Sequence, residues 1–390
     1  MVKRIVNISK SHSFFLFGPR GTGKTTLLNE QFQQKNNLYI DLLDYKYETL
    51  LYKDPDQLIS IIEAQKNLDW IIIDEIQKNP KLLDVVHRLS LNKKYKFALT
   101  GSSARKLKRQ SANLLAGRAF NFKCHPLTSY ELGKMFDLDE VLKFGLLPEV
   151  NSLSFADKKN YLRAYVDTYF KEEIVAEQIV RNLRPFRNFL DVAAQMNGKI
   201  LNINHIARDV GVDHSTVQNY FDILEDTLVG FMLTPHHRSI RKRQRQASKF
   251  YYFDPGVVSA LNRTLDSKLI HSTIEYGQAF EHFIILEFKK YIDYFKPDWN
   301  MSYLRTKDDA EIDLIIERPK MPTLAIELKS THKISELSKN TFNTFAALSK
   351  DIGKAESFLF SQDPIERKID HVWCLPWQKG LVESGIIEKV

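Results

Sequence analysis

Short apolar runs separated by helical patterns occupy the first third of the chain. Residues 14–17, 70–73 and 95–100 are mostly hydrophobic, and each run leads into glycine, acidic or hydroxyl residues. Continuous apolar runs of this length are typical of strands buried on both faces of a parallel sheet. The amino-terminal region is therefore expected to be an α/β domain.

The first apolar run leads directly into a glycine-rich turn that fits the phosphate-loop pattern G-x-x-x-x-G-K-[ST]. Glycines allow backbone N–H groups to curl around phosphate oxygens, and the following helix adds the positive end of its dipole. Lys24 is expected to reach the β- and γ-phosphates, while the Thr25 hydroxyl is expected to bind Mg²⁺. The residues expected to contact a nucleoside triphosphate are Gly18, Pro19, Arg20, Gly21, Thr22, Gly23, Lys24, Thr25 and Thr26.

Two carboxylates follow the second apolar run. Asp74 and Glu75 lie where that strand should end, and ligands bind at the carboxyl ends of strands in open parallel sheets. Asp74 is expected to bind Mg²⁺ through its water shell, and Glu75 to polarise the attacking water beside the γ-phosphate. An acidic pair often only ends a strand, but its position after a phosphate loop favours the catalytic interpretation.

Two further segments offer groups for phosphate chemistry. Thr100 or Ser102, after the third run, could sense the γ-phosphate, or the same segment could form a turn that caps the next helix. Arg118 precedes another predicted strand, residues 119–123, and is the candidate for an arginine that neutralises transition-state charge within the chain or across a subunit interface. Arg20 is a lesser candidate for that role, and an arginine at a strand start is often simply solvated.

These segments resemble a large family of prokaryotic AAA-type ATPases. The blocks that carry the resemblance are residues 17–25, 72–78, 99–107 and 114–119. Members of that family also have a carboxyl-terminal domain of unknown function that resembles PD-(D/E)xK nucleases. The resemblance covers nearly the whole chain and implies ATP, Mg²⁺ and hydrolysis, with Lys24, Thr25, Asp74 and Glu75 in the roles given above.

The middle of the chain is expected to be helical. Apolar residues keep helical spacing from 157 to 180 and from 185 to 196. Residues 203–224 predict a helix-turn-helix, with Gly211 at the turn and Asp213 as the cap of the second helix. The side chains expected to face outward, in the usual base-reading positions of such a helix, are His214, Ser215, Gln218 and Asn219.

A wing is expected to follow this motif. It would consist of residues 228–233, a basic run from 238 to 249, and residues 249–253. The side chains available there to bind a phosphate backbone are Arg238, Arg241, Lys242, Arg243 and Arg245. DNA binding is one interpretation; the other is that the motif mediates contacts between domains and that the basic loop is only solvated.

A predicted hairpin near the carboxyl end brings acidic and basic residues together. If residues 311–317 and 323–330 pair about Lys320, Asp313 lies opposite Glu327 on a neighbouring strand. Lys329 lies two residues beyond Glu327 and therefore on the same face.

Two carboxylates and an ammonium group at one place suit metal-assisted phosphodiester hydrolysis. Asp313 and Glu327 are expected to hold Mg²⁺ or Mn²⁺, with Lys329 orienting water or stabilising charge, and Glu281 on the preceding helix could supply a third ligand. The same four residues match the PD-(D/E)xK nuclease core. A salt-bridged strand pair in a fold that has lost nuclease activity would show them too.

Composition adds few constraints. The chain has 390 residues and a net charge of +8, which is compatible with nucleic acid but does not establish it. Cys124 and Cys374 lie far apart without a partner motif, which argues against a disulfide framework or zinc site and fits a reducing cytoplasm. No signal peptide or membrane-spanning apolar run is evident, so a cytoplasmic protein without a membrane partner is expected.

These patterns predict an α/β protein with three regions. They are a P-loop ATPase domain with a parallel sheet (1–135), a helical and winged-helix middle (136–245) and a PD-(D/E)xK nuclease-like α/β domain (246–390). The first functional hypothesis is an Mg²⁺-dependent ATPase that acts on DNA and carries a possible nuclease tail. The alternative is an ATP-driven regulatory switch, with the tail as a non-catalytic protein-interaction scaffold. A homo-oligomer is compatible with both, and a small-molecule kinase or transferase would leave the tail unexplained.

Overall fold

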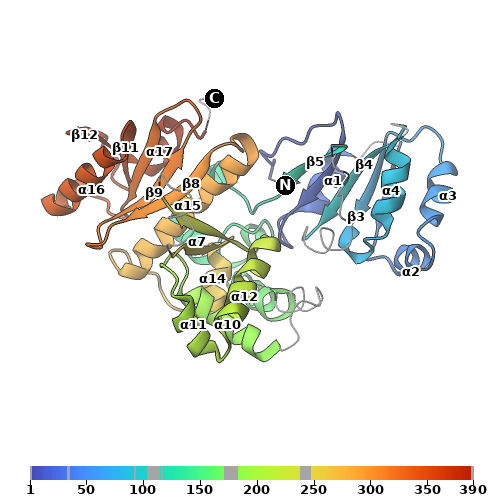
Figure 1. The fold of residues 1–390 in the computed structure, drawn as a ribbon, viewed down its shortest axis with the longest axis horizontal. Coiled ribbons are helices and arrows are strands. Elements are labelled where there is room, and N and C mark those ends of the chain that lie inside the picture. The colour runs from blue at the N-terminus through green and yellow to red at the C-terminus, as the bar shows by residue number, and fades with distance from the viewer. Residues whose placement is uncertain are drawn as a thin grey trace.

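A computed structural model of the chain contains two sheet regions with helices between and below them (Figure 1). The amino-terminal region is drawn in blue, the carboxyl-terminal region in orange and red, and the middle helices mainly in green. The structure describes residues 2–32, 36–91, 94–102, 115, 117–170, 183–237 and 247–387.

The amino-terminal region is built on a five-stranded sheet in the order β2-β3-β4-β1-β5, in which every neighbouring pair is parallel. Its strands are β1 (Ser13–Phe17), β2 (Asn37–Asp41), β3 (Trp70–Asp74), β4 (Lys96–Gly101) and β5 (Ala119–Lys123). The connecting helices are α1 (Lys24–Gln31), α2 (Tyr45–Lys53), α3 (Gln57–Glu63) and α4 (Leu82–Leu91). Every residue of β1 and β3 is buried, as expected for strands covered on both faces. The prediction of an α/β domain with a parallel sheet is confirmed.

The middle region is helical, as predicted. Its helices are α6 (Ser129–Leu132), α7 (Leu138–Phe144), α8 (Phe155–Ala164), α10 (Leu183–Gln195), α11 (Ile203–Val210), α12 (His214–Asp226) and α14 (Pro255–Leu261). A π-helical segment, Tyr165–Phe170, continues α8, and the rest of the helix predicted to residue 180 lies outside the described residues. Short 3₁₀ turns occur at Ile76–Lys78, Gly133–Met135, Val150–Ser152 and Ile334–Glu336.

The predicted helix-turn-helix corresponds to α11 and α12. Gly211 adopts a left-handed φ of 75° between them, which glycine tolerates without strain. Asp213 caps α12 by accepting a hydrogen bond from the Thr216 N–H at 2.8 Å. The buried side chains of α12 include Val217, Tyr220, Phe221 and Leu224, and the exposed ones include His214, Ser215, Gln218 and Asn219.

The carboxyl-terminal region contains an eight-stranded sheet in the order β12-β13-β11-β10-β9-β8-β6-β7. Its strands are β6 (Gly230–Pro235), β7 (Lys249–Tyr252), β8 (Asn300–Arg305), β9 (Glu311–Glu317), β10 (Thr323–Leu328), β11 (Ala355–Ser361), β12 (Arg367–Ile369) and β13 (Val372–Pro376). Helix α15 (Ile274–Phe295) shares an apolar core with Leu314, Ile326 and Phe360 of the sheet, together with α17 (Trp377–Glu383). Helix α16 (Lys339–Asp351) packs in a second core with Ile315 and Leu359. The sheet is therefore covered by helices on both faces.

The segment predicted as a wing is a hairpin that belongs to this large sheet. β6 pairs with β7 in antiparallel fashion and with β8 in parallel. The boundary predicted between residues 245 and 246 thus falls inside a hydrogen-bonded hairpin. The basic side chains of the intervening segment, Arg238, Arg241, Lys242, Arg243 and Arg245, lie outside the described residues.

Within the described residues, no helix is both long enough and apolar enough to cross a membrane. Cys124 and Cys374 are buried and are not joined in a disulfide.

Asp254 fastens α14 to the segment that follows α7. Its fully buried carboxylate accepts hydrogen bonds from the backbone N–H groups of Leu146 at 2.7 Å, Gly256 at 2.9 Å and Val257 at 3.2 Å. Burial raises the pKa of Asp254 to about 6, despite the three donors.

We expect Asp254→Asn to destabilise the middle region by about 1–3 kcal/mol, because the amide NH₂ would face a buried backbone donor. Urea denaturation at neutral pH measures this change. The exposed residue Asp298 provides a matched control, since Asp298→Asn removes a charge without a buried partner. Equal stability of the two variants would contradict the role assigned to Asp254.

Candidate functional site

The predicted phosphate loop lies between the end of β1 and the start of α1. A side chain at Gly18 would place Cβ 2.2 Å from the carbonyl oxygen of Cys124, so only glycine fits beside the segment that leaves β5. Gly23 has a left-handed φ of 87° and precedes α1 without offering a capping side chain. The first N–H groups of α1 therefore have no side-chain cap, which suits them to an anion.

Lys24 lies over this loop. Its ammonium group is buried and donates hydrogen bonds to the carbonyl oxygens of Gly18 at 2.8 Å and Pro19 at 3.1 Å. Thr22 donates from its hydroxyl to the Pro19 carbonyl at 2.8 Å, which closes the loop on itself. The lysine predicted to contact phosphates is thus held within the loop.

Asp74 gathers hydrogen bonds at the carboxyl edge of the sheet. Its carboxylate accepts from the hydroxyl of Thr25 at 2.7 Å, from the hydroxyl of Tyr39 at 2.6 Å and from the hydroxyl of Thr100. Burial and the hydrogen bond to Asp74 raise the pKa of Tyr39. The structure therefore brings the two predicted Mg²⁺ residues, Thr25 and Asp74, into direct contact. Tyr39 was not predicted, because a tyrosine within a strand carries no motif.

Glu75 lies next to this carboxylate in a strained backbone conformation. Its φ of 59° is left-handed, which is uncommon for residues other than glycine and is concentrated at functional sites. Its N–H donates to Thr100 Oγ1 at 3.2 Å, and its carboxylate accepts from the side-chain amide of Gln77. Gln77 also donates to Ser102 at 3.1 Å. Both sensor candidates, Thr100 and Ser102, therefore lie beside the predicted catalytic pair; the alternative helix cap lies outside the described residues.

Arg118 lies near the amino-terminal ends of the strands, whereas the phosphate loop lies at their carboxyl-terminal ends. It precedes β5, whose first residue pairs with Ser13 at the start of β1, whereas the phosphate loop follows the end of β1. At about 3.3 Å per residue, the four steps from Ser13 to Phe17 separate the two ends of the strand by roughly 13 Å. Arg118 is exposed and contacts the His87 ring at 3.2 Å. The structure thus does not bring Arg118 to the phosphate loop of its own chain, and action across a subunit interface stays a prediction.

Arg20, the second candidate, lies on the exposed side of the loop, and its carbonyl oxygen accepts from the Tyr165 hydroxyl at 2.8 Å. This bond joins the phosphate loop to the middle region.

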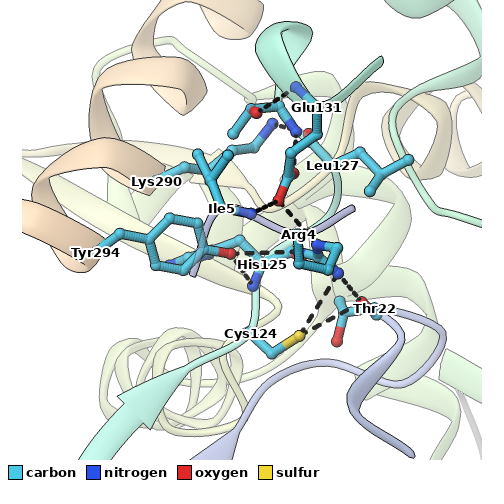
Figure 2. A network of polar contacts seen from close by, with 10 residues as sticks. Arg4, Ile5, Thr22, Cys124, His125, Leu127, Glu131, Lys290 and Tyr294 are labelled. Carbon is cyan, nitrogen blue, oxygen red and sulfur yellow. Dashed lines mark hydrogen bonds and ion pairs between the residues drawn. The ribbon is translucent and has the colours of Figure 1, made fainter. Parts of the chain in front are cut away.

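Behind the loop, Arg4 joins the amino-terminal and carboxyl-terminal regions (Figure 2). Its guanidinium donates to the carbonyl oxygens of Thr22 and His125, both at 2.6 Å, and to Glu131 Oε1 at 2.9 Å. The same group lies 3.4 Å from the hydroxyl of Tyr294 on α15. Arginine suits this position because its planar fork presents five donors in fixed directions. No sequence motif marks Arg4.

The hairpin predicted near the carboxyl end is present in the predicted register. The ladder pairs of β9 and β10 are Ile316 with Leu324, Ile315 with Ala325 and Leu314 with Ile326, all centred on Lys320. One further step along the same register places Asp313 opposite Glu327. Asp313 Oδ2 also accepts from the Leu328 N–H at 2.8 Å, which ties it to β10.

Asp313, Glu327 and Lys329 converge as expected. Lys329 Nζ lies 2.6 Å from Glu327 Oε1, while Glu327 Oε2 is buried without a hydrogen-bond partner in the described structure. Burial and the neighbouring charge of Asp313 raise the pKa of Glu327 to about 8. An unsatisfied buried carboxylate oxygen is the kind of group that binds a cation or a proton.

Glu281 is engaged differently from its prediction as a third metal ligand. Its Oε1 accepts from the Tyr251 hydroxyl at 2.6 Å and lies 3.2 Å from Lys249 Nζ, and Lys249 also forms an ion pair with Glu311. No group of three or more His, Cys, Asp or Glu side chains in the described parts of the chain is arranged to hold a metal ion. Glu281 is thus held by protein donors.

Three residues of this cluster were not predicted from the sequence: Lys249, Tyr251 and Glu311. Glu311 lies two residues before Asp313 on one strand, so alternation along β9 could have drawn attention to it. Lys249 and Tyr251 come from β7, more than fifty residues earlier, and only the tertiary structure brings them here.

Comparisons with known proteins divide the chain into three matches. Residues 10–133 match the AAA domain family, residues 135–268 a Domain of unknown function (DUF8612), and residues 276–379 a Domain of unknown function (DUF4143). The second match includes α14, which lies beyond the boundary predicted at residue 245. Together with the phosphate loop and the parallel sheet, the first match identifies the amino-terminal region as an AAA-type P-loop ATPase domain.

Similar proteins were found in bacteria and archaea. An uncharacterized protein of Mycobacterium tuberculosis is 27% identical over 319 residues, which cover 81% of this chain and 70% of that protein. An uncharacterized protein of Methanocaldococcus jannaschii is 23% identical over 352 residues, covering 83% and 76% respectively. Among solved structures, a Walker-type ATPase of Pyrococcus abyssi aligns with a TM-score of 0.43 and 13% identity, covering 64% of this chain and 90% of that one.

Proposed function

We propose that this protein binds and hydrolyses ATP with Mg²⁺ and acts on DNA, which its carboxyl-terminal region cuts. The observation that carries ATP hydrolysis is the contact between Thr25 and Asp74, 2.7 Å apart at the edge where the phosphate loop ends. A hydroxyl and a carboxylate are oxygen donors of the kind that Mg²⁺ prefers in phosphate sites. We also propose a cytoplasmic protein, because Cys124 and Cys374 are free thiols, as a reducing compartment allows.

Each residue at this edge has a distinct role in the proposal. Lys24 would move from the loop carbonyls to the β- and γ-phosphates, and Thr25 with Asp74 would hold Mg²⁺, which neutralises charge on the phosphates when bound. Glu75 would orient and polarise the attacking water. Gln77 holds the Glu75 carboxylate by donating to it, and the Thr100 hydroxyl accepts from the Glu75 N–H.

Support for DNA as the partner comes from the middle region. Helix α12 exposes His214, Ser215, Gln218 and Asn219, the positions that face the major groove in helix-turn-helix proteins. A basic segment that joins β6 to β7 begins at Arg238, 12 residues after the end of α12. We propose that this winged-helix-like unit contacts the DNA backbone and the bases near it.

The proposed cutting site lies in the carboxyl-terminal sheet. The order α15, β8, β9, β10, α16, β11 resembles that of PD-(D/E)xK nucleases, with Asp313, Glu327 and Lys329 at the corresponding places. The residues fit a divalent cation in part: two carboxylates meet and Glu327 Oε2 has no protein partner. Asp313 and Glu327 would hold Mg²⁺ or Mn²⁺, which activates water and stabilises charge on phosphate when bound. Lys329 would keep Glu327 oriented through its ion pair.

A specific observation also favours the alternative function, a nucleotide-driven switch. Arg4 contacts Thr22 in the phosphate loop, Glu131 after β5 and Tyr294 on α15 (Figure 2). A change in the shape of the phosphate loop on nucleotide binding would thus act through Arg4 on the carboxyl-terminal region. In this second proposal that region binds a protein partner and cuts nothing.

Lys24→Ala should weaken ATP binding by at least about 100-fold, because an ammonium contact to a triphosphate contributes several kcal/mol. Isothermal titration calorimetry with ATP and Mg²⁺ measures the dissociation constant. Lys46→Ala removes an exposed lysine of the same domain and should bind like the unaltered protein. Unchanged affinity of Lys24→Ala would refute the phosphate-loop assignment.

Glu75→Gln should bind ATP with an affinity within about threefold of the unaltered protein, yet lower the turnover number by about 100-fold or more. The amide keeps the shape of the carboxylate but cannot accept a proton from water. Phosphate release measures turnover, with the exposed Glu48→Gln on α2 as the control. Normal turnover in Glu75→Gln would assign water activation to another group.

Asp313→Ala should abolish Mn²⁺-dependent cutting of single- and double-stranded DNA, because one of two metal-holding carboxylates is lost. Gel electrophoresis of labelled DNA reports the cutting. Asp309→Ala, an exposed acidic residue in the turn before β9, should cut normally. Persistent cutting by Asp313→Ala would move the site elsewhere, and no cutting by the unaltered protein would favour the switch.

A further inference from the structure

Lys249 is a buried cation placed between two carboxylates. Only 4% of the residue is exposed, and its ammonium forms ion pairs with Glu281 on α15 and Glu311 on β9. The two ion pairs therefore hold a positive charge between these carboxylates.

Tyr251 adds a second protein donor to the same carboxylate. It lies two residues after Lys249 on β7, so both side chains extend from one face of the strand. Its hydroxyl donates to Glu281 Oε1 at 2.6 Å, the same oxygen that faces Lys249 at 3.2 Å. Glu281 is thus supplied with a hydrogen bond and an ion pair by β7.

The neighbouring half of the cluster is arranged differently. Glu327 forms an ion pair through Oε1 with Lys329, but its Oε2 is buried and has no partner among the described residues. Glu311 in the first half and Asp313 in the second lie two residues apart on one face of β9, so the two halves are adjacent. One half holds an ammonium between its two carboxylates, and the other retains an unsatisfied carboxylate oxygen.

We propose that Lys249 takes the place of a second divalent cation, so that the carboxyl-terminal site binds a single divalent ion between Asp313 and Glu327. The ammonium satisfies Glu281 and Glu311, and its charge repels a further cation from that half of the cluster. This inference rests on the proposed metal site and specifies its stoichiometry. It also assigns Glu281 to positioning Lys249.

The number of bound Mn²⁺ ions tests the proposal. Calorimetry and electron paramagnetic resonance would count the ions on the full-length chain carrying Lys24→Ala, without nucleotide, so that no triphosphate recruits Mn²⁺ to the phosphate loop. In that background we expect about one ion per chain with Lys249 present and about two with Lys249→Met, because the freed carboxylates of Glu281 and Glu311 become oxygen ligands. Lys249→Arg keeps the cation and should bind about one ion.

Unfolding measurements show whether the Lys249→Met variant is folded. Removing the ammonium leaves two partly buried carboxylates without a counter-ion, so this variant should unfold at a lower temperature, and Mn²⁺ should raise that temperature again. Lys249→Gln, which can still donate hydrogen bonds, serves as a milder second variant. Lys268→Met removes an exposed lysine and should change neither stoichiometry nor stability.

The outcomes separate this inference from the function on which it rests. If the protein binds one Mn²⁺ ion both with Lys249 and with Lys249→Met, the role of Lys249 is overturned. If Asp313→Asn then binds no Mn²⁺, the metal site itself is retained. No Mn²⁺ bound with Lys249 present would overturn both the metal site and the inference. Two ions bound with Lys249 present would overturn the inference alone.

Discussion

The buried carboxylate of Asp74 joins the elements that form the nucleotide-binding edge of the amino-terminal sheet. It accepts hydrogen bonds from Thr25 on α1, Tyr39 on β2 and Thr100 on β4, so three elements meet on one side chain. A buried carboxylate is stable only when such donors surround it, because an unpaired buried charge costs several kcal/mol. The parallel strand order makes this possible: β3 lies between β2 and β4, and the carboxyl ends of all three strands meet at one edge. The position of Glu75 and the shape of the phosphate loop both depend on this arrangement.

A second constraint joins the ATPase domain to the rest of the chain. The guanidinium of Arg4 fills the space between the phosphate loop, the segment after β5 and helix α15. His125 extends this junction, since its ring lies 2.8 Å from the carboxylate of Asp293 on α15. Polar networks of this kind fix relative positions, because each donor lost leaves a buried acceptor unsatisfied. One polar network therefore joins the phosphate loop to helix α15.

The carboxyl-terminal cluster has a different electrostatic character. Glu281, Glu311, Asp313 and Glu327 are balanced only in part by two ammonium groups, those of Lys249 and Lys329. One of these lysines comes from β7, which follows the basic segment of the middle region. Because β6 and β7 extend the carboxyl-terminal sheet, the middle region contributes a residue to this site. The two regions are better regarded as one unit than as separate modules.

The sequence by itself determined several of the elements and the turns that follow them. The apolar runs predicted β1 and β3, the glycine-rich turn predicted the phosphate loop, and the symmetry about Lys320 predicted the register of β9 and β10, because these features depend on local periodicity and turn chemistry. Only the tertiary structure decided which distant residues meet. It placed Arg118 at the end of the strands away from the phosphate loop, and it brought Arg4 to that loop and Lys249 to Glu281. Packing and strand order, rather than spacing along the chain, set those positions. Single charged residues that act through such contacts leave no periodic trace in the sequence.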